Sequence, residues 1–211
     1  MDPIGLFKRS YALMGDQYLL FVGITFVGVL LGSLVPFGIL LGPMMVGIYL
    51  CFIDRERGKK VEFGTLFKGF DQFADSLIAT LMMVGITLIA LVPVFVLMIV
   101  GMVVTNGSGM ELLVFLLSYL LIFVVMIFVY LPFLFVFQLI ADRKVTGPQA
   151  LSLSFKALKA NFVGCAALVF VMAILSVVAT MACYIPVFFL MPISLGALFV
   201  AYRDIFGPKP E

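Results

Sequence analysis

The residues able to do chemistry are few, and most are carboxylates in the charged stretches of the chain. They are Asp54, Glu56, Glu62, Asp71, Asp75, Asp142 and Asp204. Such a set could bind a metal, but its members alternate with Lys and Arg, which favours helix caps and local ion pairs. No glycine-rich phosphate loop, zinc-ligand spacing or nucleophile elbow accompanies them. We therefore expect no enzyme activity, no metal and no cofactor.

The long charge-poor stretches hold almost no reactive groups. The chain has no His, and Cys51, Cys165 and Cys183 are scattered through apolar sequence, where we interpret them as small packing residues. Glu111 is the one ionisable acid or base in these stretches, and it adjoins the polar turn 105–109. Ionisable residues inside a membrane mark proton relays and ion paths. Their absence argues against proton-coupled transport and voltage sensing.

The composition identifies the class of protein. Of 211 residues, 64% are hydrophobic and 11% are charged, and the mean hydropathy is +1.29. A soluble domain has roughly half apolar and about a quarter charged residues, so a soluble fold is excluded. The net charge of +2 is too small to indicate nucleic acid. We predict an all-α, polytopic integral membrane helical bundle that forms one membrane domain over residues 1–211.

Three charge-poor regions, 17–53, 76–141 and 162–202, predict about six transmembrane helices in three hairpins. The polar turn divides the middle region, and Pro36 and Pro186 divide the outer two. Each half of an outer region has about 16–18 residues, or roughly 24–27 Å of helix, which barely crosses a hydrocarbon core about 30 Å thick. Full hairpins are the favoured interpretation, and re-entrant pairs are the alternative.

The basic residues predict the orientation. All 13 Lys and Arg lie before the first hairpin, between hairpins, or in the tail 203–211. The positive-inside rule then predicts a multi-pass protein of the bacterial cytoplasmic (inner) membrane with both termini in the cytoplasm. The first apolar region is too long for a cleavable signal, and no small-residue cleavage site follows it.

Each predicted hairpin follows a short amphipathic stretch, at 2–16, 61–75 and 148–161. Apolar residues recur there at helical spacing: Ile4, Phe7, Tyr11 and Met14; then Phe63, Phe67, Phe70, Phe73 or Ala74, and Leu77; then Leu151, Phe155, Leu158 and Phe162. Asp2 and Pro3 suit an N-cap and first helical position. We therefore expect three amphipathic helices on the cytoplasmic side.

The prolines and charged pairs suggest a threefold internal repeat. Asp54-Arg55 precedes Phe67-Lys68 by the same offset as Asp142-Arg143 precedes Phe155-Lys156, and Phe7-Lys8 takes the equivalent place before the first span. The predicted helix bends are Pro36, Pro43, Pro93, Pro132, Pro186 and Pro192. Pro93 and Pro132 interrupt the longest spans, where a kink is favoured over a substrate site at a broken helix.

Two glycine pairs, Gly28 with Gly32 and Gly38 with Gly42, fit the small-xxx-small pattern for close helix approach. We interpret them as packing within the chain, with a contact between subunits as the alternative.

The run from Asp142 to Phe162 carries a resemblance to a family. Asp142-Arg143-Lys144, Ala150-Leu151, Ser154-Phe155-Lys156 and Lys159-Ala160-Asn161-Phe162 are similar to a motif of uncharacterised bacterial six-helix membrane proteins. That family includes the membrane domain attached to some glycerophosphoryl diester phosphodiesterases. The resemblance implies a six-helix, cytoplasm-facing membrane domain of unassigned activity. This chain has no phosphodiesterase domain, so that activity does not carry over.

The favoured function is a non-catalytic one. Basic amphipathic segments lie in the headgroup region and attract anionic lipid, so the chain is predicted to organise membrane lipids or a partner protein. The candidate contacts with anionic lipid or a partner are Lys59, Lys60, Lys68, Lys156 and Lys159. Another copy of the same chain, in a homo-oligomer, is an alternative protein partner. The competing interpretation of these lysines is that they only enforce topology.

The alternative function is a passive transporter or channel for a small neutral or amphipathic solute. Internal repeats are common in transporters. Its polar lining would consist of Ser, Thr and Tyr side chains together with Gln138. This inventory is thin, and three hairpins give no simple arrangement of two halves.

Overall fold

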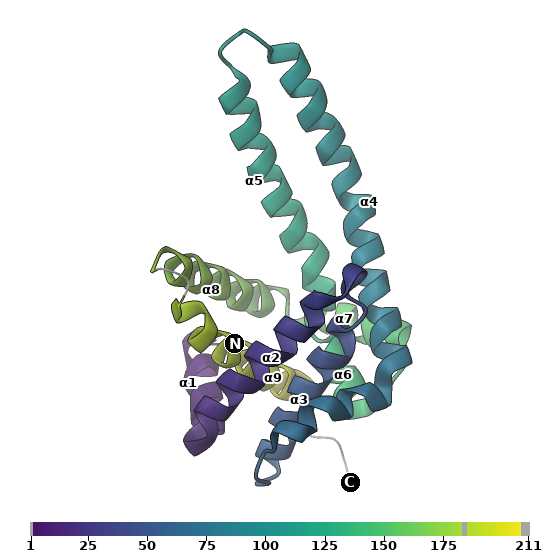
Figure 1. The fold of residues 1–211 in the computed structure, drawn as a ribbon, viewed down its shortest axis with the longest axis vertical. Helices are drawn as coiled ribbons and strands as arrows, with labels where there is room; N and C mark the ends of the chain where they lie inside the picture. Colours follow the sequence, from purple (N-terminus) through teal and green to yellow (C-terminus); the bar gives the residue numbers. More distant parts are fainter. Residues whose placement is uncertain (1, 183–184, 208–211) are drawn as a thin grey trace.

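The protein is built from helices throughout residues 2–182 and 185–207, the part of the chain that a computed structural model describes (Figure 1). The α-helices are α1 Pro3–Met14, α2 Tyr18–Leu34, α3 Leu41–Glu56, α4 Phe73–Thr105, α5 Glu111–Tyr130, α6 Val136–Arg143, α7 Gly147–Ala160, α8 Phe162–Met181 and α9 Ile185–Phe206. Short 3-10 helices join them: η1 Gly15–Gln17, η2 Pro36–Gly38, η3 Phe63–Gln72 and η4 Leu131–Phe133. Cys183 and Lys209 lie outside the described residues.

Five helical stretches among these residues are long and apolar enough to cross a membrane. They are Pro3–Leu34, Phe63–Thr105, Glu111–Arg143, Phe162–Met181 and Ile185–Phe206. The helical membrane class is therefore confirmed, whereas six spans are not. The predicted sixth, α3, has 16 residues, or about 24 Å of helix. The 3-10 helix that begins at Pro36 separates it from α2.

The hairpin of α4 and α5 extends beyond the rest of the molecule (Figure 1). The α2–α3 connection ends beside the lower part of α4, since the Cα of Gly38 faces the Thr80 side chain. From Thr80 to Thr105, α4 continues for another 25 residues, which is about 38 Å of helix. That length exceeds a hydrocarbon core of about 30 Å. The α2–α3 turn therefore lies far from the α4–α5 turn, measured along the axis of α4.

The six predicted bend positions fall into three structural settings. Pro36 and Pro132 begin or lie within the short 3-10 helices η2 and η4, which interrupt the α-helical path. Pro43 and Pro186 lie in the first turns of α3 and α9, where the missing N–H has no helical partner to lose. Pro93 and Pro192 lie inside α4 and α9.

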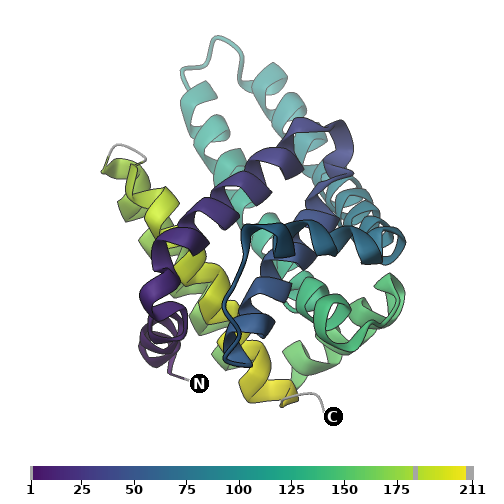
Figure 2. The same ribbon diagram turned by 60° about the horizontal axis from the view of Figure 1, so that its bottom comes forward.

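The amphipathic segments pack in a cyclic order. The segment before each hairpin contacts the returning helix of the preceding one: η3 packs on α3, α7 packs on η4 and α6, and α1 packs on α9. The first segment thus closes the ring against the last hairpin. Figure 2 shows α1 and the end of α9 together at the end of the molecule opposite the α4–α5 turn.

Small residues make these contacts close. A Cβ on Gly47 of α3 would overlap the Leu66 carbonyl of η3, and a Cβ on Gly196 of α9 would overlap the Ser10 hydroxyl of α1. Ser10 donates a hydrogen bond to the Ile193 carbonyl at 2.8 Å. In the third contact, the Phe135 N–H donates to Ser154 Oγ of α7 at 3.2 Å. Each segment therefore packs closely against the backbone of its partner.

The glycine pairs act within the chain, as predicted. Gly28 faces Ile48 and Leu66, Gly32 faces Leu41, and Gly42 faces the Ser76 carbonyl and the Thr80 hydroxyl. The predicted start of the first helix is also confirmed, because the Asp2 carboxylate accepts a hydrogen bond from the Ile4 N–H at 3.1 Å and Pro3 is the first helical residue.

Candidate functional site

Charged residues from the ends of α3, α6 and α9 meet at a junction on the side of the molecule that carries the basic loops. Arg203 binds Asp142 with Nη1 at 2.8 Å and Nη2 at 3.2 Å. Its Nε donates to Glu56 at 2.8 Å, and the Tyr202 hydroxyl donates to Asp142 at 2.8 Å. The Asp142 side chain is wholly buried. A buried carboxylate with three donors is a structural centre that holds the three returning helices together.

Three further arginines have comparable structural contacts. Arg9 forms a two-pronged pair with Asp204 at 2.8 Å. Arg55 contacts Asp16 and donates to the Leu13 carbonyl at 3.0 Å. Arg143 donates to the Phe206 carbonyl at 2.6 Å. These arginines are engaged with the protein itself, so their positive charges are unsuited to binding a mobile ligand.

The lysines differ from the arginines. Among the described residues, the one lysine close to a carboxylate is Lys59, whose Nζ lies 3.8 Å from Asp54. The other four candidate lysines are exposed and form no ion pair within the described part of the chain: Lys60, Lys68, Lys156 and Lys159. The predicted contact residues are therefore among the basic residues whose charge faces outward, as are Lys8, Arg57 and Lys144.

Exposed aromatic rings surround Lys68 on η3. Phe63, Phe67 and Phe70 are each 39–45% exposed, whereas Thr65, Leu66 and Gly69 face inward against α3. The predicted phenylalanine face is therefore the outward one. The segment is a 3-10 helix that runs directly into α4, not a separate α-helix. Phenylalanine beside lysine on an exposed face is the composition of a membrane-interface segment.

A similar arrangement occurs on α7. The Nζ of Lys159 lies 4.5 Å from the centre of the Phe155 ring, and Phe155 and Phe162 are both exposed. Leu158, from the same predicted face, is buried instead, so that face is divided between core and surface. On α1 the division is the same, with Ile4 and Tyr11 exposed and Met14 buried.

The candidate lysines lie in two groups. Lys59, Lys60 and Lys68 follow α3 or lie on η3, and Lys156 and Lys159 lie on α7. Both η3 and α7 pack against α4 and α6, but no described contact joins a lysine of one group to one of the other. The two groups therefore lie on different elements.

Sequence reasoning did not identify the junction as a unit. The available signal was the equal spacing of Asp54-Arg55 and Asp142-Arg143 from the amphipathic stretches that follow them. The inner amide of Gln138 was noted as a polar lining residue. The structure places it 1% exposed within the core, and neither its nitrogen nor its oxygen has a hydrogen-bond partner among the described residues.

The fold defines an all-helical, multi-pass membrane protein. The chain matches no protein-family model, and no curated protein and no solved structure matches it significantly. The resemblance to the phosphodiesterase-attached membrane domain stays a prediction.

Proposed function

We propose that this protein is a non-catalytic integral membrane protein that organises membrane lipids or holds a partner protein through its basic amphipathic segments. One observation carries the proposal: exposed lysines without ion-pair partners in the described chain lie beside exposed phenylalanines on η3 and α7. Rings of this kind enter the acyl boundary while the ammonium groups stay among the headgroups. Anionic lipid is the favoured partner, because each nearby lysine contributes about 1 kcal/mol to its attraction.

The proposed location is the bacterial cytoplasmic membrane, with both termini and all three basic segments in the cytoplasm. The placement of every described Lys and Arg away from the α4–α5 turn supports this orientation. We further propose that the α4–α5 hairpin crosses the bilayer completely. The depth of the α2–α3 turn beside Thr80 favours the re-entrant alternative for that hairpin.

The test is lipid retention by purified protein. Charge reversal of Lys59, Lys60, Lys156 and Lys159 should reduce the phosphatidylglycerol that co-purifies from mixed vesicles, as counted by native mass spectrometry. Neutral phosphatidylethanolamine in the same samples should change little. A matched control reverses Arg57 and Lys144, which are exposed and basic but lie at helix C-caps. Unchanged phosphatidylglycerol retention in the fourfold variant would remove the lipid role.

Passive conduction of a small neutral solute is the second candidate. The observation that favours it is the Gln138 amide inside the helical core, which makes no hydrogen bond of normal geometry within the described residues although the Tyr49 hydroxyl lies close to it. A buried polar group without a well-placed partner is costly unless something binds it. Reconstituted protein should then pass neutral solutes faster than empty vesicles, and Gln138→Leu should abolish the difference. Fluxes equal to those of empty vesicles would exclude conduction.

A further inference from the structure

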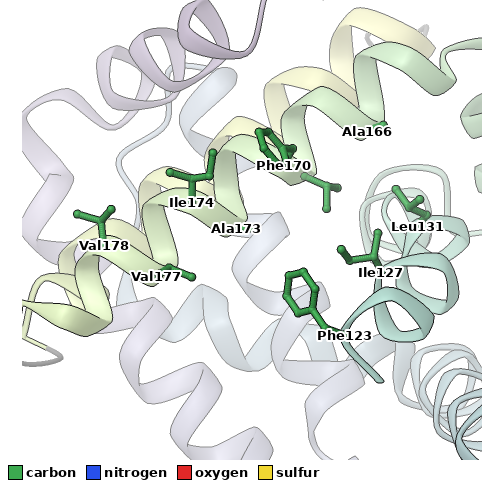
Figure 3. Close-up of a pocket in the computed structure, with 10 residues that line it drawn as sticks. Phe123, Ile127, Leu131, Ala166, Phe170, Ala173, Ile174, Val177 and Val178 are labelled. Atoms are coloured by element: carbon green, nitrogen blue, oxygen red, sulfur yellow. The ribbon is translucent and has the colours of Figure 1, made fainter. Parts of the chain in front are cut away.

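An apolar groove runs between α5 and α8, on the outer surface of the helical body (Figure 3). The two helices converge where Leu131 lies near Ala166, and they diverge toward Phe123 and Val178 (Figure 3). The groove has a volume of about 350 Å³. A second hollow of about 300 Å³ shares several of its lining residues and continues it along α5. The side chains that line the first hollow are all apolar.

The dimensions of the groove suit one acyl chain of one leaflet. Its wall on α5, which runs along the proposed membrane-crossing hairpin, extends from Phe123 to Leu131, which is about 12 Å at the rise of an α-helix. Half of a hydrocarbon core is about 15 Å. Ala166 and Ala173 have small side chains at two positions seven residues apart on the α8 wall. The groove is therefore wide enough there for an acyl chain, and no protein side chain has to move.

A positive charge lies at the converging end of the groove. A more polar hollow of about 270 Å³ is lined by Lys159 and the residues that follow it to Gly164. Phe162 and Val163 of this hollow lie four and three residues before Ala166, so they belong to the same stripe of α8 as the groove. Lys159 therefore stands where the headgroup of a lipid would lie if its chain occupied the groove.

We propose that the α5–α8 groove binds one anionic phospholipid, with an acyl chain against Ala173 and Phe170 and the phosphate at Lys159. This proposal rests on the proposed lipid-organising function and names its site. Charge complementarity selects the occupant, because Lys159 and Lys156 have no ion-pair partner in the described chain and no carboxylate lines either hollow. A helix from a second copy would fill the apolar groove but would leave both charges unmatched.

The test uses the absence of tryptophan from the chain. Phe170→Trp places a single fluorophore in the groove, and Phe128→Trp places one on α5, exposed and one residue from the lining residue Ile127 but outside the groove. Each protein is reconstituted with phosphatidylglycerol and phosphatidylethanolamine, one of which carries brominated chains that quench tryptophan.

In the Phe170→Trp protein, brominated phosphatidylglycerol should occupy the site about fivefold more strongly than the brominated neutral lipid, because one lysine contributes about a factor of five. Lys159→Gln should abolish this preference. Ala173→Phe, which fills the groove, should lower quenching by both lipids. Phe128→Trp should report equal quenching by the two lipids.

Equal quenching at position 170 would overturn the site and leave only bulk lipid there. Weak quenching at 170 together with cross-linked dimers would overturn it in favour of a second copy. If the groove fails while the fourfold lysine reversal still lowers phosphatidylglycerol retention, the proposed function stands without this site. If retention is also unchanged, both fall.

Discussion

Arg203 of α9 and Asp142 of α6 form a two-pronged ion pair in which the carboxylate is fully buried and the arginine side chain is 9% exposed. Arg9 and Asp204 form a pair of the same geometry, but their side chains are 57% and 34% exposed. Two pairs with one geometry and different burial allow the energetic effect of burial to be separated from that of the contact.

Asp142→Asn should lower the free energy of unfolding by about 3 kcal/mol, because Arg203 would keep its buried charge and lose the fully buried one of its two counter-ions. Asp204→Asn, the matched control, should cost less than about 1 kcal/mol because water screens an exposed pair. Denaturant titrations in one detergent provide both values. Similar losses in the two variants would contradict the role assigned to the junction.

Gly69→Ala should strongly reduce the yield of folded protein. A Cβ at Gly69 would overlap the Pro43 carbonyl and the Gly47 backbone of α3, and neither can move without shifting a helix. Gly64 lies on the same 3-10 helix, and a Cβ there would meet no atom within 4 Å. Size-exclusion profiles of Gly69→Ala and Gly64→Ala should therefore differ, with the control close to wild type. An intact Gly69→Ala protein would show that η3 does not pack this closely.

A membrane-impermeant thiol reagent is added from the side of the membrane opposite the two termini. Ser33→Cys should resist this reagent, whereas Ser108→Cys should react with it. Ser108 lies in the turn between α4 and α5, and Ser33 precedes the α2–α3 turn, which lies beside Thr80 of α4. The background would carry Ala at Cys51, Cys165 and Cys183. Labelling of Ser33→Cys from the far side would restore the fully crossing hairpin.

Gln17→Ala should destabilise the protein by about 1–3 kcal/mol, the cost of leaving buried polar groups unpaired. The Gln17 amide donates to the Val61 carbonyl and accepts from the Val61 N–H, both at 3.0 Å, and so ties the start of α2 to the loop after α3. Gln149→Ala is the control, since Gln149 caps the exposed start of α7. Thermal unfolding in detergent compares them, and an equal effect would show that the tie is unimportant.

The class of fold was predictable because hydropathy and proline positions act locally. The turn at 105–109, the Asp2 cap and the glycine contacts all follow from nearby sequence. The number of membrane crossings was not predictable from local sequence. It depends on where the α2–α3 turn packs along α4, and that position is set by the contact of Gly38 with Thr80, which is distant in sequence.

The site was predictable only as a list of charges. Sequence alone identifies 13 basic residues, but it does not separate the arginines that bind Asp142, Glu56, Asp16 and Asp204 from the lysines that remain outward. That separation depends on which helix ends meet. The α5–α8 groove had one signal, the spacing of Ala166 and Ala173, and such spacing is common in apolar helices.

The contact of α1 with α9 has a consequence for biosynthesis. Ser10 cannot meet Ile193 until nearly the whole chain has left the ribosome, because 183 residues separate them. The first helix to be made is therefore among the last to reach its final place. A nascent chain arrested before α9 should expose α1 to proteases, and release of the last helix should protect it.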